Sequence, residues 1–369
     1  MEREDLYNLK KEQMSELASY RKTLYDHPVL KFLFLELTLR CNERCLHCGS
    51  RCGDVPSSEL TFDQYRTILS DIRQDFDIRK FQLCITGGEP LLRGDFFEIM
   101  GYADQLGYNW GMTSNGTLID AETARKLHEC HMKTISVSID GLEASHNAFR
   151  QTKDGYQRAM KGIEALIAEG GFKHIQVTSV MNHGNIRELE KMYELFAGMD
   201  IDSWRVIGIE PMGRALMHPE LLLTAEDQRY LFDFIRERRM EDMPVTYGCS
   251  HFLGFHYERE VREKYFLCNT GLYTASICCN GDITGCLDIE RRPEFVQGNI
   301  LHDRLKDVWE NRFRCFREDL AERNETCAAC EYRTWCNGGA HHSYDYDTEK
   351  QRICFKGILW NSDSEGTIQ

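Results

Sequence analysis

Strand and helix patterns alternate from residue 31 to residue 211, and this alternation constrains the fold more than any other feature of the sequence. Short runs rich in Ile, Val and Phe, such as "KTISVSIDG" at 133–141, are followed by amphipathic runs such as "GYQRAMKGIEALIAEGG" at 155–171. Strands that alternate with helices form parallel sheets, because each crossover helix returns the chain to the same end of the sheet. The sequence therefore predicts an α/β protein.

Six strands of this kind occur, and no clear strand–helix pair follows the sixth. A closed barrel of parallel strands has eight. We therefore predict a partial (β/α)6 TIM-type barrel that does not close. The expected strands span 31–39, 81–88, 109–116, 133–141, 174–181 and 203–211.

The chain changes character on both sides of the predicted barrel. Apolar residues at helical spacing near the N-terminus predict a helical extension over 1–30. Beyond about residue 240, cysteines and glycines become frequent and the helical periodicity weakens. We therefore expect a barrel domain over 31–238 and a cysteine-rich domain over 239–369.

Charge and hydropathy narrow the range of partners. The net charge is −14, and an acidic protein does not attract the polyanionic surfaces of nucleic acids or membranes. We find no signal peptide and no apolar run of transmembrane length, which predicts a cytoplasmic protein. The 16 cysteines would then sit in a reducing compartment, where clustered cysteines usually bind metal or take part in chemistry.

Three of these cysteines lie in "CNERCLHC" at 41–48, directly after the first expected strand. This loop would sit at the carboxyl end of the sheet, where parallel barrels build their active sites. Three thiolates suit an iron–sulfur cluster that keeps one iron open for a small molecule. Zinc is the competing interpretation, with His47 or Cys52 as a fourth ligand, but CxxxCxxC is not the usual zinc spacing.

Motifs that follow the later strands, in order, resemble those of the radical S-adenosylmethionine (SAM) superfamily. They are "TGGEP" at 86–90, "TSNGT" at 113–117, "SVSIDG" at 136–141, "SHNAFR" at 145–150 and "WRVIGIEPMGRA" at 204–215. The resemblance implies that Cys41, Cys45 and Cys48 hold a 4Fe–4S cluster whose open iron binds SAM. It also implies cofactor contacts for the amino, ribose, carboxylate and adenine groups of SAM. These contacts are Gly87, Gly88, Glu89, Pro90, Ser114, Asn115, Ser138, Asp140, Arg150, Ile209 and Glu210.

The C-terminal cysteines resemble the SPASM domain, which holds auxiliary iron–sulfur clusters in radical SAM enzymes that modify peptides and proteins. The resemblance implies two groups of metal ligands. The distal cluster would use Cys327, Cys330, Cys336 and Cys354, and the proximal one Cys268 and Cys286.

The proximal set is incomplete, because Ala340 stands where the family has a further cysteine, and His341 and His342 follow it. This cluster could recruit Cys249, Cys278, Cys279 or a histidine, could be smaller, or could be lost. We expect some cluster there.

The resemblance also implies the chemistry. A reduced ferredoxin or flavodoxin would supply one electron that splits SAM, and the resulting 5′-deoxyadenosyl radical would abstract a hydrogen from the substrate. An auxiliary cluster could accept a second electron, which makes the net change an oxidation. We therefore expect a radical SAM maturase that installs a crosslink, thioether or related change in a ribosomally made peptide.

The leader of such a peptide needs a binding site. Only about 30 residues precede the first expected strand, too few for a leader-binding domain of about 80 residues. We therefore expect a separate leader-recognition protein or direct binding of the peptide. The alternatives are a sulfatase-maturase-like enzyme that acts on a protein side chain and, of another class, a non-catalytic iron–sulfur or zinc scaffold.

Overall fold

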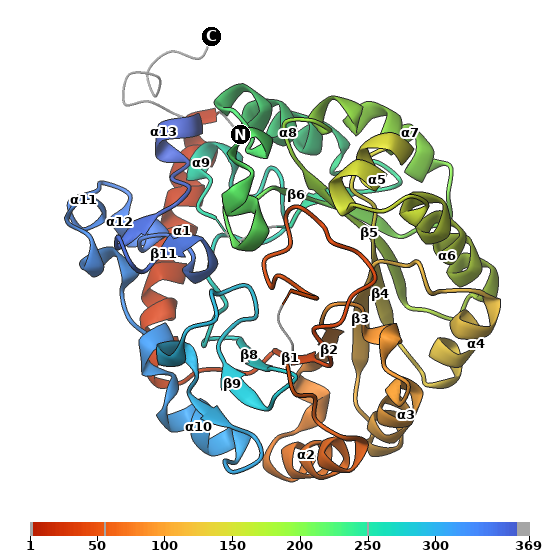
Figure 1. Cartoon of the computed structure of the whole chain (residues 1–369). Helices are drawn as coiled ribbons and strands as arrows, with labels where there is room; N and C mark the ends of the chain where they lie inside the picture. The colour runs from red at the N-terminus through yellow and green to blue at the C-terminus, as the bar shows by residue number, and fades with distance from the viewer. Residues whose placement is uncertain (1–2, 55–56, 249–250, 360–369) are drawn as a thin grey trace.

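A curved, mainly parallel sheet forms the centre of the molecule, and helices surround its outer face (Figure 1). The computed structural model describes residues 3–54, 57–248 and 251–359. The strands of the sheet are β1 (Phe32–Glu36), β2 (Gln82–Thr86), β3 (Trp110–Ser114), β4 (Thr134–Ser138), β5 (His174–Met181), β6 (Ser203–Gly208), β7 (Val245–Tyr247), β8 (Thr274–Ile277), β9 (Asp282–Thr284) and β10 (Gly298–Asn299).

The strand order confirms the predicted partial barrel. The sheet runs β10-β9-β8-β1-β2-β3-β4-β5-β6-β7, so β7 and β10 are its two edges and the sheet is open within the described residues. Strands β1 to β6 are parallel neighbours in chain order, and β7 and β8 extend them in parallel on either side. These two strands have only three and four residues, too few to give a periodic pattern in the sequence.

The crossover helices begin and end at sequence signals that stabilise helix termini. Thr61 caps α2 in a capping box with Gln64, and Thr224 caps α8 in the same way with Asp227. Gly107 ends α3 in the left-handed conformation that glycine adopts without strain. The crossover helices are α2 (Phe62–Asp75), α3 (Phe96–Leu106), α4 (Ala121–Glu129), α5 (Glu143–Arg150), α6 (Gly155–Glu169), α7 (Leu189–Ala197) and α8 (Ala225–Arg238).

The N-terminal helix α1 (Arg3–Asp26) lies beside the C-terminal region and not against the sheet (Figure 1). The Trp335 indole donates to Ser15 Oγ at 3.0 Å, and Arg21 donates to the Thr334 carbonyl at 3.2 Å. The C-terminal region itself has only short elements. They are α9 (Gly254–Tyr257), α10 (Leu305–Asn311), α11 (Glu325–Ala328), α12 (Arg333–Cys336), β11 (Tyr344–Asp345), β12 (Lys350–Gln351) and α13 (Lys356–Leu359).

Two buried clusters hold these parts together. The large one fills the space between the sheet and its helices, with Trp110 and Trp204 fully buried. A smaller aromatic cluster joins α1 to the C-terminal region, and Cys268 and Cys336 pack against it. Its buried members are Met14, Phe252, Phe255, Phe266, Tyr332 and Ala340.

Candidate active site

The cysteine loop lies at the carboxyl end of the sheet, directly after β1. Cys41, Cys45 and Cys48 are free thiols, each partly exposed. Arg214, which follows β6, fixes the loop from the opposite side. Its guanidinium donates to the carbonyl of Cys45 at 3.0 Å and to that of Cys52 at 2.6 Å. The sheet thus supports the loop at two strand ends.

Two glycines let the turn after β2 approach this loop closely. The amide of Gly88 donates to the Thr38 carbonyl at 2.7 Å, and that of Glu89 donates to the Arg40 carbonyl at 2.9 Å. A Cβ on Gly87 would lie 2.4 Å from the Thr38 oxygen, and one on Gly88 would lie 2.1 Å from the Arg40 oxygen. Any side chain at either glycine would push the cysteine loop away.

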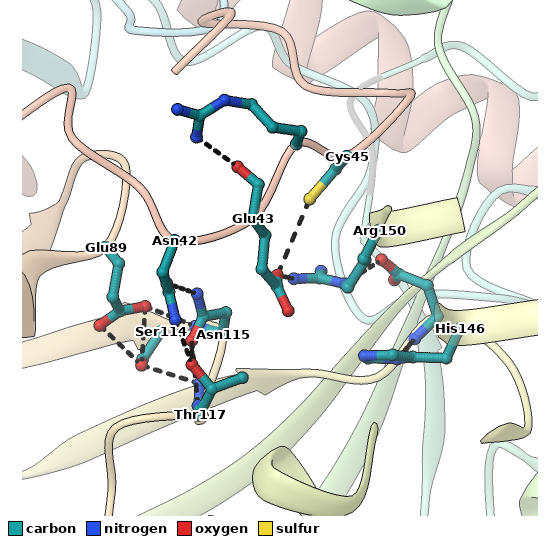
Figure 2. A network of polar contacts seen from close by, with 12 residues as sticks. Asn42, Glu43, Cys45, Glu89, Ser114, Asn115, Thr117, His146 and Arg150 are labelled. Atoms are coloured by element: carbon teal, nitrogen blue, oxygen red, sulfur yellow. Dashed lines mark hydrogen bonds and ion pairs between the residues drawn. The ribbon is translucent and has the colours of Figure 1, made fainter. Parts of the chain in front are cut away.

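Glu89 sits at the centre of a buried polar network that joins three strand ends (Figure 2). Its carboxylate accepts from Ser114 Oγ at 3.0 Å and from the Asn115 amide at 2.8 Å. The Asn115 side chain donates to Asn42 Oδ1 at 2.8 Å, and Asn42 donates to Thr117 Oγ1 at 2.7 Å. Burial raises the pKa of Glu89 to about 7, although these hydrogen bonds oppose the rise.

A buried ion-pair network lies on the other side of the loop (Figure 2). Arg150 donates to Asp140 at 2.7 Å and to Glu43 at 2.8 Å, and all three residues are buried. Although burial opposes it, the charge of Arg150 keeps the pKa of Asp140 below its usual value. His146 accepts from the Asp140 amide at 3.0 Å. Glu43 therefore ties the cysteine loop to the ends of β4 and α5.

Several buried polar atoms of this site are available to a ligand. Among the described residues, Glu43 Oε1, His47 Nδ1 and His146 Nε2 are buried without a hydrogen-bond partner. Burial lowers the pKa of His47 to about 4 and that of His146 to about 3, so both imidazoles are neutral near pH 7. Three carboxyl groups and one guanidinium leave the buried site with excess negative charge. The arrangement favours a cationic ligand.

The spacing of the thiols distinguishes the two metal interpretations. A zinc ion bound by thiolates at about 2.3 Å needs sulfur atoms about 3.8 Å apart. Among the described residues, only Glu210, His251 and His342 bring three potential ligand atoms within 4.8 Å of one another, and no cysteine belongs to that group. A 4Fe–4S cluster needs wider spacing, because each thiolate binds a different iron. The three thiols are therefore more widely spaced than a single zinc ion requires.

Cys52 is buried and contacts the loop without belonging to its motif. Its amide donates to Cys48 Sγ at 3.4 Å, and its thiol donates to the Gly87 carbonyl at 3.7 Å. A hydrogen bond from the Cys52 thiol lowers the pKa of Cys48 to about 6, and the same contact raises the pKa of Cys52. The Cys52 thiol thus lies against Cys48 as well as against the Gly87 carbonyl.

The remaining predicted SAM contacts lie at three places. Pro90 is buried directly after Glu89, and Ser138 ends β4. Ile209 is buried directly after β6, but the Glu210 carboxylate lies 2.6 Å from His251 Nε2. Glu210 thus contacts the segment after β7.

The four cysteines that the SPASM resemblance assigns to a distal cluster influence one another's pKa values. The pKa of Cys327 is raised by burial and by the nearby thiols of Cys354 and Cys330. Burial raises the pKa of Cys336 to about 12, and the thiols of Cys354, Cys327 and Cys330 raise it further. Such mutual effects require the thiols to be neighbours, as ligands of one cluster would be.

The proximal group contains only two of the predicted thiols. Burial raises the pKa of Cys286, and the Cys268 thiol adds to the rise, so these two are neighbours. Ala340 is fully buried in the aromatic cluster against which Cys268 packs. His341 bonds the Tyr346 hydroxyl at 2.6 Å.

The other candidate ligands for this group are placed elsewhere or lie outside the described residues. The Cys279 amide donates to the carboxylate of Glu36, the last residue of β1, and the Cys279 thiol donates to Ser57 Oγ. Cys278 lies near Glu36 and Arg291. Cys249 lies outside the described residues. Cys278 and Cys279 thus lie beside Glu36 at the end of β1.

A loop of three cysteines thus lies at the carboxyl end of a partial barrel, beside buried carboxyl groups, as the resemblance to radical SAM enzymes implies. Family comparisons agree. Residues 35–196 match the radical SAM superfamily, and residues 268–331 match an iron–sulfur cluster-binding domain, SPASM. The chain belongs to the radical SAM superfamily and carries a SPASM domain. These domains imply a 4Fe–4S cluster that binds SAM, and auxiliary clusters in addition.

The curated relatives include AdoMet-dependent heme synthases and mycofactocin maturases. An AdoMet-dependent heme synthase of Methanosarcina barkeri is 29% identical over 327 residues, covering 84% of this chain and 90% of the relative. The mycofactocin maturase MftC of Mycolicibacterium smegmatis is 29% identical over 318 residues, covering 85% and 78%. Both groups match along most of the chain.

Solved structures agree on the fold. SuiB of Streptococcus suis, bound to S-adenosylmethionine, superposes with a TM-score of 0.68 at 17% identity, over 91% of this chain and 77% of that one. No helix in the described residues is both long and apolar enough to cross a bilayer.

Proposed function

We propose that this radical SAM enzyme oxidatively modifies a ribosomally made peptide by forming a crosslink, a thioether or a related bond. The MftC relatives carry this proposal, because they match 85% of the chain and are mycofactocin maturases. The cluster and SAM would together supply a 5′-deoxyadenosyl radical at the carboxyl end of the barrel. The sulfatase-maturase-like alternative stays a prediction.

The proposed SAM site rests on charge and on unpartnered atoms. SAM carries a sulfonium, an ammonium and a carboxylate, so its net charge is positive. We assign the ammonium to Glu89 and the turn around it, and the carboxylate to Arg150. Glu43, Asp140 and Glu89 give the site the opposite sign of charge, and Glu43 Oε1 has no hydrogen-bond partner among the described residues. Ser114, Asn115, Ser138 and Ile209 would complete the contacts.

The proposed division of the chain follows the same assignments. Residues 31–238 would hold SAM, and 239–369 would hold a distal cluster on Cys327, Cys330, Cys336 and Cys354. A proximal cluster on Cys268 and Cys286 would need further ligands, because Ala340 stands where the family has a cysteine. A ferredoxin or flavodoxin would donate electrons, and a separate protein could present the peptide.

A second candidate is a heme precursor as substrate. The heme synthase relative has the same identity as the maturase, and this chain covers 90% of it. Such a substrate is a tetrapyrrole and not a peptide.

Mass spectrometry tests the proposal. The protein is co-expressed with a small peptide encoded beside its gene, and the Cys45→Ala variant serves as the control. We expect the peptide to lose two hydrogens with the wild type and to stay unchanged with the variant. An unmodified peptide, together with 5′-deoxyadenosine release that depends on an added porphyrin, would favour the heme precursor.

A further inference from the structure

Three side chains that bind metals well converge where the barrel meets the C-terminal region. Glu210 follows β6, and His251 follows β7. His342 lies in the short helical turn 341–343, which comes after Cys336 in the sequence. Their ligand atoms all lie within 4.8 Å of one another, the only such group of three in the described chain. None of the three is a cysteine, and none belongs to a cluster motif.

We propose that Glu210, His251 and His342 bind a divalent transition-metal ion, of the type of zinc or ferrous iron, separate from the iron–sulfur clusters. Two imidazole nitrogens and one carboxylate are a donor set that both ions accept. The three residues come from segments 41 and 91 positions apart in the sequence, so only the folded chain assembles them.

The spacing suits an ion at bonding distance. Ligands about 2.0–2.1 Å from a tetrahedral zinc ion lie about 3.3 Å from one another. The Glu210 Oε1 to His251 Nε2 separation is 2.6 Å, and no separation in the group exceeds 4.8 Å, so the observed range brackets the required value. Small side-chain rotations would place all three atoms around one ion.

The surroundings favour a bound cation. The side chains of His251 and Glu210 are 3% and 10% exposed. The Phe355 ring lies 5.1 Å from that of His251 and limits access of water. Burial lowers the pKa of His342, and Asp288 lies near enough to influence it.

The backbone of His251 is anchored independently of the ion. Arg262 donates to the His251 carbonyl at 2.5 Å and pairs with the buried Glu258. The site therefore stands on a rigid support, as a metal site requires. Three protein ligands leave at least one coordination position of a tetrahedral ion for water or for an oxygen of the substrate.

Zinc binding to the reconstituted enzyme tests this site. Protein with its clusters assembled is given Zn²⁺ and freed of excess by gel filtration, and zinc, iron and sulfide are then counted. We expect about one zinc per wild-type chain and at least a tenfold loss of it in His251→Ala and in His342→Ala, with iron unchanged. His256→Ala is the matched control, because His256 is an exposed histidine in the same segment.

Zinc X-ray absorption of the wild type supplies a second readout that does not depend on the folding of a variant. The proposal predicts nitrogen and oxygen neighbours at about 2.0–2.1 Å and no sulfur at about 2.3 Å. Sulfur in the first shell would mean that zinc occupies a cysteine site, and would overturn the proposal. A wild type that binds no zinc, or histidine variants that keep it, would overturn it equally.

Discussion

Replacing Glu89 with Gln should weaken SAM binding and remove its dependence on pH. Glu89 is buried beside Ser114 and Asn115, and its pKa is raised to about 7 by burial. A raised pKa means that the carboxyl is neutral below pH 7 and ionised above it. Only the ionised form attracts the ammonium of SAM, so affinity should rise with pH.

The expected sizes follow from this titration and from the charge removed. Between pH 6 and pH 8 the ionised fraction rises from about one-tenth to about nine-tenths, so wild-type affinity should rise roughly tenfold. A hydrogen bond to a charged group contributes about 1.5–3 kcal/mol, so Glu89→Gln should weaken binding roughly 10- to 150-fold at pH 8. Its remaining affinity should not change with pH.

Anaerobic calorimetry of SAM binding to cluster-loaded protein, repeated from pH 6 to pH 8, measures both effects. Glu122→Gln is the control, because Glu122 is an exposed carboxyl on α4 and should leave both affinity and pH profile unchanged. Iron must be counted in each sample, so that loss of the cluster is not taken for loss of affinity. A wild-type affinity that is flat with pH, or a Gln variant that keeps the wild-type slope, would refute the reasoning.

Three further substitutions test other parts of the site. Gly88→Ala should lower cluster loading, because the new methyl would meet the Arg40 carbonyl at 2.1 Å, whereas Gly94→Ala has nothing within 4 Å and should load normally in an iron assay. Arg214→Leu leaves two carbonyl oxygens of the cysteine loop without their donor, at about 1–3 kcal/mol each. This variant should have a lower melting temperature and should lose its cluster absorbance faster in air. An unchanged rate of absorbance loss would argue against a stabilising role for the hydrogen bonds of Arg214. Cys336→Ser should remove about four irons per chain and leave SAM binding intact, and undiminished iron would contradict the distal ligand set.

The sequence predicts the main architecture because its signals are local. Each strand from β1 to β6 is a short apolar run before an amphipathic helix, and Thr61 marks a helix start by its own chemistry. Since parallel strands share one carboxyl end, the order of motifs along the chain also predicts that Glu89, Asn115 and Asp140 converge. The structure brings two of these residues into contact, because the Asn115 amide donates to the Glu89 carboxylate.

Long-range partners could not be predicted in the same way. Glu43 stands between two cysteines and looks like a spacer, yet it pairs with Arg150, 107 positions away. Arg214 contacts the loop from 162 positions beyond Cys52. Glu210 belongs to the motif at the end of β6, but its carboxylate lies 2.6 Å from the imidazole of His251, which follows β7. Such pairs depend on the register and twist of the folded sheet, which local periodicity does not encode.

Release of 5′-deoxyadenosine tests the central claim most directly. Anaerobically reconstituted protein is mixed with dithionite and SAM, and the nucleoside is measured by liquid chromatography. The wild type should release it, and Cys45→Ala, which lacks one thiolate of the loop, should not. A wild type that is fully loaded with iron and sulfide but forms no 5′-deoxyadenosine would contradict the account.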